Sequence, residues 1–76
     1  MNKQRRKELN DIIETLNNVI ADIEALRDEE QDYYDNMPEN LQGSEKGEMA
    51  ERAISEMDDA ISSIEDAIGS LENACD

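Results

Sequence analysis

The clearest pattern in the chain is a seven-residue repeat in its second half, where residues 53–73 read AISEMDD, AISSIED and AIGSLEN. Apolar residues recur at steps of three and four, the spacing of a helix that buries one face in a coiled-coil seam. The intervening positions are acidic or small and polar, so the pattern predicts an amphipathic helix over about 45–74. Its apolar stripe comprises Ala50, Met57, Ile64 and Leu71, then Ile54, Ile61, Ile68 and Cys75, with Ala53, Ala60, Ala67 and Ala74 alongside.

A second stripe with the same spacing occupies the first half of the chain. It predicts a helix over about 3–35, which would be roughly 50 Å long, against roughly 45 Å for the helix over 45–74. The two predicted helices therefore match in length. The members of this stripe are Leu9, Ile12, Ile13, Leu16, Val19, Ile20, Ile23, Leu26, Glu30, Tyr33, Tyr34 and Met37.

Residues 36–44, NMPENLQGS, interrupt both stripes and predict a turn. Pro38 disfavours helix at the preceding residue, Gly43 suits a positive-φ stop, and Ser44 is a typical N-cap. A connection this short returns the second helix antiparallel to the first. We therefore expect an all-α fold, an antiparallel two-helix hairpin resembling a coiled coil, as a single domain over residues 1–76. Pairing of two hairpins into a four-helix bundle is a further possibility.

Antiparallel pairing also predicts a register. It places Leu26 near Ile54 and Leu16 near Ile64 in the seam between the helices. On one flank, large side chains would lie opposite alanines, which favours a close approach of the helices without voids. These expected pairs are Ile12 with Ala74, Val19 with Ala67, Leu26 with Ala60, and Tyr33 with Ala53.

The turn end of the hairpin breaks the stripe pattern. Glu30 takes a seam position roughly opposite Ala50, and Gly47 lies where a tyrosine ring would need room. We expect the rings of Tyr33 and Tyr34 to cover Gly47, with one hydroxyl directed at Glu30. The end of the core would be closed by Met37, Pro38 and Leu41.

The charge of the chain is strongly negative and unevenly distributed. It has 21 acidic and 7 basic residues, a net charge of −14, and basic residues concentrate at the start. Pairing of the helix ends would place this basic cluster beside Glu72 and Asp76, which predicts charge matching; a separate anionic contact is the alternative. The basic cluster consists of Lys3, Arg5, Arg6 and Lys7.

This charge balance bears on partners and location. Nucleic-acid phosphates would be repelled, so we expect no direct nucleic-acid binding, whereas a basic groove on another protein would be attracted. The sequence has no apolar run long enough for a signal peptide or a membrane span. We therefore expect a cytoplasmic protein that does not bind a membrane. The single cysteine, Cys75, takes a seam position and is interpreted as a small apolar residue in a reducing compartment.

The residue inventory argues against catalysis. There is no histidine, so a nucleophile and histidine pair is impossible, and no glycine-rich phosphate loop is present. The run Asp28-Glu29-Glu30-Gln31-Asp32 is acidic, but it lacks the Asp-x-Asp-x-Asp-Gly turn of a calcium loop. We therefore predict that the protein is not an enzyme, that it has no catalytic or metal-binding residues, and that it binds no cofactor.

Carboxylates around the turn form the candidate site. Acids near the C-terminal end of the first helix oppose its dipole and one another, which makes them costly for stability alone. Carboxylates spaced along a rigid rod coarsely imitate the phosphates of duplex DNA, while simple solvation of a charged face is the alternative. The predicted partner-binding residues are Asp28, Glu29, Asp32, Tyr33, Tyr34, Asp35, Glu39, Leu41, Glu45 and Glu48.

Three features of the sequence together resemble a known group of proteins: residues 29–48, EEQDYYDNMPENLQGSEKGE, the basic start, and the AI-x-x-[IML] heptads. The chain resembles small uncharacterised acidic helical-hairpin proteins of phages and prophages of Gram-positive bacteria. This resemblance extends over nearly the whole chain, and residues 33–44 are its most specific part. The resemblance implies that the protein acts in a bacterial host cell. In that context it also implies an inhibitor that occupies the nucleic-acid-binding surface of a nuclease, CRISPR effector, restriction enzyme or polymerase. Secreted hairpins of the WXG type share the fold class, but their Trp-x-Gly turn is missing.

Two functional hypotheses follow from the sequence. The first is a nucleic-acid mimic that uses the turn-end carboxylates to bind a basic groove, with aromatic and apolar residues as anchors. The second is a structural or adaptor coiled coil that self-associates or pairs with another helical protein.

Overall fold

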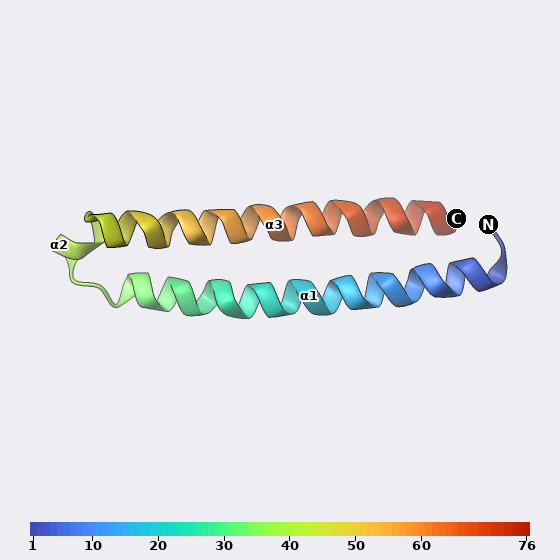
Figure 1. The fold of residues 1–76 in the computed structure, drawn as a ribbon, viewed down its shortest axis with the longest axis horizontal. Coiled ribbons are helices and arrows are strands. Elements are labelled where there is room, and N and C mark those ends of the chain that lie inside the picture. Colours follow the sequence, from blue (N-terminus) through green and yellow to red (C-terminus); the bar gives the residue numbers. More distant parts are fainter.

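A computed structural model describes residues 1–76 as a rod of 58 × 15 × 12 Å. Its elements are α1 (Lys3–Asp35), α2 (Glu39–Gln42) and α3 (Glu45–Cys75). The long helices α1 and α3 lie side by side and run in opposite directions, so the chain termini meet at one end and α2 forms the other (Figure 1). The predicted all-α hairpin is confirmed.

Local signals set the limits of α1. At its start, the side chain of Asn2 accepts a hydrogen bond from the backbone N–H of Arg5 at 2.8 Å, as an N-cap residue does. At its end, the backbone N–H of Asn36 donates to the carbonyl of Asp32 at 3.0 Å. Pro38 follows with no N–H to donate, so the chain turns away from the helix axis.

The connection differs from the predicted turn. It contains the single helical turn α2, which begins directly after Pro38, a residue whose fixed φ suits a helix start. Gly43 has a φ of −85°, so the expected positive-φ stop is wrong. The expected side-chain cap at Ser44 is also wrong, because its hydroxyl donates back to the carbonyl of Leu41 and its own carbonyl accepts from Glu48 N–H at 2.9 Å.

Gly47 is buried beneath the end of α2. A Cβ atom at this position would lie 1.9 Å from the carbonyl oxygen of Gln42 and 2.7 Å from its Cα. The side-chain amide of Gln42 in turn donates to the carbonyl of Tyr34 at 3.1 Å, which ties α2 to the end of α1. The expectation that tyrosine rings need this space is therefore wrong, since the backbone of Gln42 takes it.

The core is a narrow seam between α1 and α3. Only 5 of 76 residues are buried, and the central cluster is Ile20, Ile61 and Ile68. These isoleucines occupy the seam positions that the two stripes predicted. Partly buried side chains extend the cluster along the rod: Ile13, Leu16, Ile23 and Ile64.

Two polar contacts cross between α1 and α3. Arg27 bonds to Asp58 at 2.9 Å, and the Tyr34 hydroxyl donates to Glu51. Long side chains lean toward the N-terminus of their own helix, so in an antiparallel pair they meet residues that are offset along the neighbouring helix.

The flank where large side chains were expected to pack against alanines is open. Ile12 is 48% exposed, Val19 38%, Leu26 59% and Tyr33 50%, so the close packing predicted within the hairpin is wrong. A hairpin has one seam, and the seam is filled by the isoleucine cluster. The alanines of this flank stay accessible too: Ala53 is half-buried, and Ala60, Ala67 and Ala74 are exposed.

The basic cluster does not pair with the C-terminal acids. Its only ion pair joins Lys7 to Asp11, one turn along α1, at 3.3 Å. Both side chains are largely exposed, so this pair contributes little to stability. No direct ion pair joins the basic cluster to Glu72 or Asp76, and Lys3, Arg5 and Arg6 present their charge to solvent.

Candidate functional site

The hairpin collects the predicted acidic residues at its turn end. They come from the last two turns of α1, the start of α2 and the first turn of α3. All of them are exposed, so their charges face solvent. We define this set as the turn-end acids: Asp28, Glu29, Asp32, Asp35, Glu39, Glu45 and Glu48.

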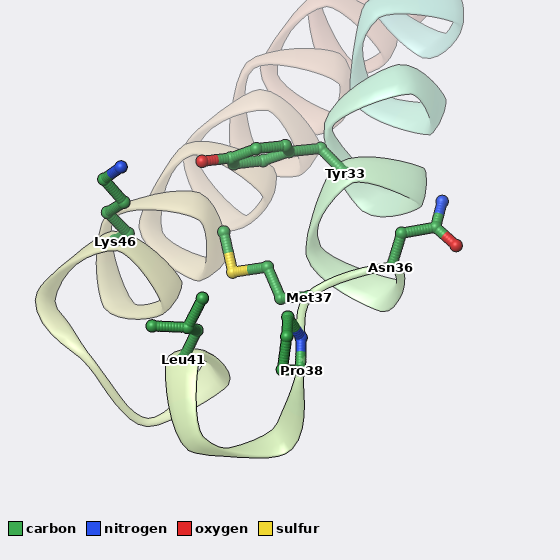
Figure 2. A pocket seen from close by; sticks show the side chains of 6 residues that line it. All are labelled: Tyr33, Asn36, Met37, Pro38, Leu41 and Lys46. Atoms are coloured by element: carbon green, nitrogen blue, oxygen red, sulfur yellow. The ribbon is translucent and has the colours of Figure 1, made fainter.

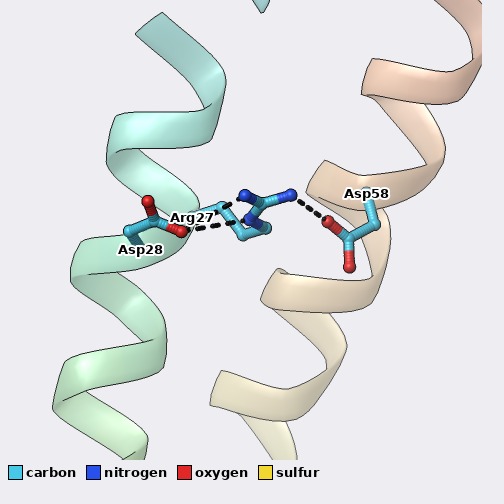
Figure 3. Close-up of polar contacts among 3 residues, drawn as sticks. All are labelled: Arg27, Asp28 and Asp58. Carbon is cyan, nitrogen blue, oxygen red and sulfur yellow. Dashed lines mark hydrogen bonds and ion pairs between the residues drawn. The ribbon is translucent and has the colours of Figure 1, made fainter. Parts of the chain in front are cut away.

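Few cations offset the turn-end acids. Arg27 lies between the helices and bridges Asp28, at 3.2 Å, to Asp58, at 2.9 Å (Figure 3). Hydrogen bonds to these two carboxylates raise the pKa of Arg27 above its ordinary value, with the bond to Asp58 contributing most. Lys46 and Arg52 form no ion pair. Asp28 is thus the only member of the set held in an ion pair within the chain.

The helix dipoles stabilise some of the turn-end acids and destabilise others. Glu45 and Glu48 stand in the first turn of α3, where the positive end of the dipole favours a carboxylate. Asp32 and Asp35 stand in the last turn of α1, which holds no basic residue and presents the negative end. The carboxylates of α1 are therefore electrostatically unfavourable where they lie.

The two tyrosines of the turn end have different environments. Tyr33 is 50% exposed and lies across an open hollow (Figure 2). Tyr34 is half-buried, and its hydroxyl donates to Glu51 rather than to Glu30, which corrects the expected contact. That hydrogen bond is the main cause that raises the pKa of Tyr34 above its ordinary value of 10.0; burial and the charges of Glu51 and Asp35 add to it.

The end of the core is hollow rather than closed. Leu41 is 41% exposed, and a shallow depression of about 400 Å³ opens between α2 and the first turn of α3 (Figure 2). The expected closure by Met37, Pro38 and Leu41 is therefore incomplete, because these side chains line the depression without filling it. Its lining residues are Tyr33, Asn36, Met37, Pro38, Leu41 and Lys46.

A second exposed feature is an apolar surface that the sequence pattern predicted to be buried between the two long helices. We define the apolar side of the rod as the exposed row Ile12, Val19, Leu26 and Tyr33 of α1 with the row Ala53, Ala60, Ala67 and Ala74 of α3. The seven-residue spacing of both rows was visible in the sequence. Only the structure shows that the seam excludes them.

The chain holds no arrangement of three or more acidic or cysteine side chains suited to a metal ion. Cys75 is a free thiol, half-buried near the end of α3. None of the helices is long and apolar enough to cross a bilayer.

No protein-family model matches the chain, and neither curated proteins nor solved structures show significant similarity to it.

Proposed function

We propose that this protein is an acidic protein-binding module that mimics nucleic acid and occupies a basic groove. The partner is a nucleic-acid-binding or defence protein of a bacterial host, of the class of nucleases, CRISPR effectors, restriction enzymes and polymerases. The site of action is the cytoplasm of that cell. The turn-end acids bind the groove, and the protein acts by blocking access rather than by catalysis.

The observation that carries this proposal is the excess of unpaired carboxylates on a thin helical rod. Among the turn-end acids only Asp28 has an ion-pair partner, although the chain has a net charge of −14. A groove built for phosphates presents lysine and arginine at short intervals, since duplex DNA carries about one charge per 1.7 Å. Carboxylates on successive helical turns meet such a groove with complementary charge.

Apolar anchors accompany the charges. Tyr33 and Leu41 are both exposed and lie around the same hollow, next to the turn-end acids. Tyrosine is enriched among the residues that carry most of the binding energy at interfaces, and burial of Leu41 beside it would add apolar contact area. Tyr34 contributes less directly, because its hydroxyl is occupied by Glu51.

The test is capture of partners from a Gram-positive bacterial lysate with the tagged chain at about 0.1 M and about 1 M salt, where the Debye length falls from ~10 to ~3 Å. The proposal predicts capture of a nucleic-acid-binding protein at low salt and its release at high salt. The variant Asp28→Asn, Asp32→Asn, Asp35→Asn and Glu39→Gln should lose this partner.

The matched control removes the same number of charges at the opposite end of the rod, by Glu8→Gln, Glu14→Gln, Glu72→Gln and Asp76→Asn. It should retain the partner. Equal loss in both variants would show that binding follows total charge rather than the turn-end acids, and the proposed site would be abandoned.

The exposed apolar side favours a second candidate, a structural or adaptor coiled coil. In that case capture would resist salt, and it would be lost when Val19 or Leu26 becomes charged. The two functions therefore respond in opposite ways to salt and to the two classes of variant.

A further inference from the structure

The apolar side is wider than one hairpin needs. In heptad terms the buried and half-buried isoleucines take positions a and d, whereas Ile12, Val19 and Leu26 all take position g. A helix in a two-helix seam needs only a and d, but a helix that packs against two neighbours needs a third apolar row at e or g. Each long helix here has that third row but packs against only one other long helix.

We propose that a second copy of this chain covers the apolar side and completes an antiparallel four-helix bundle. The two copies are related by a two-fold axis, so the same side of each hairpin meets the other. This inference does not rest on the proposed function, because it is argued from the exposed apolar rows of α1 and α3.

The dimensions of the rod suit such a pairing. A face 58 Å long and 12–15 Å wide has an area of about 700–870 Å², close to the roughly 800 Å² that each partner buries in a standard interface. Removing the exposed row of α1 from water would also remedy the small core, since only 5 of 76 residues are buried in the single hairpin.

Charge selects the orientation of the second copy. One end of the rod carries the solvent-exposed basic cluster together with the last two acids of the chain, and the other carries the turn-end acids. If both turns lay at the same end, the two sets of turn-end acids would meet. With turns at opposite ends and the axis at Val19, the middle residue of α1, Lys3 lies level with Asp35 of the second copy and Arg6 level with its Asp32.

Two surface hollows agree with this orientation. They lie on the apolar side at opposite ends of α1. The first hollow of one copy would therefore face the second hollow of the other copy. The first, of about 280 Å³, is lined by Met1, Arg5, Glu8, Leu9 and Ile12. The second, of about 300 Å³, is lined by Glu30, Tyr33, Lys46, Met49, Ala50 and Ala53.

The first test is the mass of the full chain in solution by sedimentation equilibrium. The proposal predicts twice the 8.6 kDa of one chain. Val19→Glu places two carboxylates on the axis and should halve this mass while far-UV circular dichroism stays helical, because Val19 is already 38% exposed in the hairpin. The control Asn17→Glu adds the same charge at an exposed position of α1 outside the apolar side and should remain a dimer.

A monomeric wild type at every concentration, or equal loss of mass in both variants, would overturn the proposal. Orientation is tested by oxidative cross-linking in a Cys75→Ser background. Turns at opposite ends predict a covalent dimer from Val19→Cys alone. Cross-linking only in a mixture of Val19→Cys and Ala67→Cys chains would show both turns at the same end and overturn the orientation.

Discussion

Single residues at the turn end decide whether the hairpin closes, and Gly47 is the strictest of them. Alanine normally stabilises a helix interior by about 0.5–1 kcal/mol relative to glycine. At Gly47 the added Cβ would meet the backbone of Gln42 at 1.9 Å, and backbone cannot rotate away. We therefore predict that Gly47→Ala lowers the free energy of unfolding by about 2 kcal/mol or more.

Gly69 supplies the control for this prediction. It also lies inside α3, but an added Cβ there would meet nothing within 4 Å. Gly69→Ala should therefore stabilise the chain by about 0.5–1 kcal/mol. Urea unfolding of both variants, followed by circular dichroism, measures the difference, and stabilisation by Gly47→Ala would contradict the packing of α2 on α3.

The hydroxyl of Tyr34 links stability to alkaline pH. Its pKa is raised in the folded chain, chiefly by donation to Glu51, above an ordinary value of 10.0. A group with a raised folded pKa contributes stability below the unfolded pKa, and this contribution is lost as pH rises through the folded value. We predict that the melting temperature falls above pH 10 more steeply in the wild type than in Tyr34→Phe.

Tyr33→Phe is the matched control, because it removes the other of the 2 tyrosines and should keep the wild-type pH profile. In that variant the absorbance of tyrosinate reports Tyr34 alone, and its midpoint should lie above 10.0. Identical profiles in the wild type and both variants would assign the effect to general alkaline unfolding rather than to Tyr34.

At the scale of elements, α1 and α3 are held together by one seam of isoleucines. Ile61 is 6% exposed and belongs to the central cluster. Truncation of a buried isoleucine to alanine costs about 2–5 kcal/mol, and to valine about 0.5–1.5 kcal/mol. We predict this order for Ile61→Ala and Ile61→Val in urea unfolding, and equal costs would show that the seam is not packed around Ile61.

The helices could be predicted from the sequence, because seven-residue spacing and the Pro38 interruption are local signals. The polar contacts of Arg27 and Tyr34 across the seam could not, since such contacts have no periodic signature. The role of Gly47 was also hidden, because α2 approaches it through the backbone of Gln42. Of the candidate site, the grouping of acids at the turn followed from the hairpin, whereas the exposure of the apolar side needed the structure.

At the scale of the whole molecule, charge repulsion is the dominant long-range term. The net charge is −14, and the ion pairs involve only Lys7 and Arg27 among the cations. Salt screens repulsion between exposed like charges over distances beyond ~10 Å at about 0.1 M. We predict that the melting temperature rises as sodium chloride increases from about 0.01 to about 1 M. A fall would mean that ion pairs outweigh repulsion.

Competition with duplex DNA tests the central claim most directly. A captured partner would be bound to the immobilised hairpin and titrated with a short DNA duplex, with release measured at constant salt. A nucleic-acid mimic occupies the groove that DNA occupies. We therefore predict that the duplex releases all of the bound partner from the hairpin, with one duplex bound for each hairpin displaced. If the partner binds DNA while it stays bound to the hairpin, the turn-end acids do not imitate nucleic acid and the proposed function is wrong.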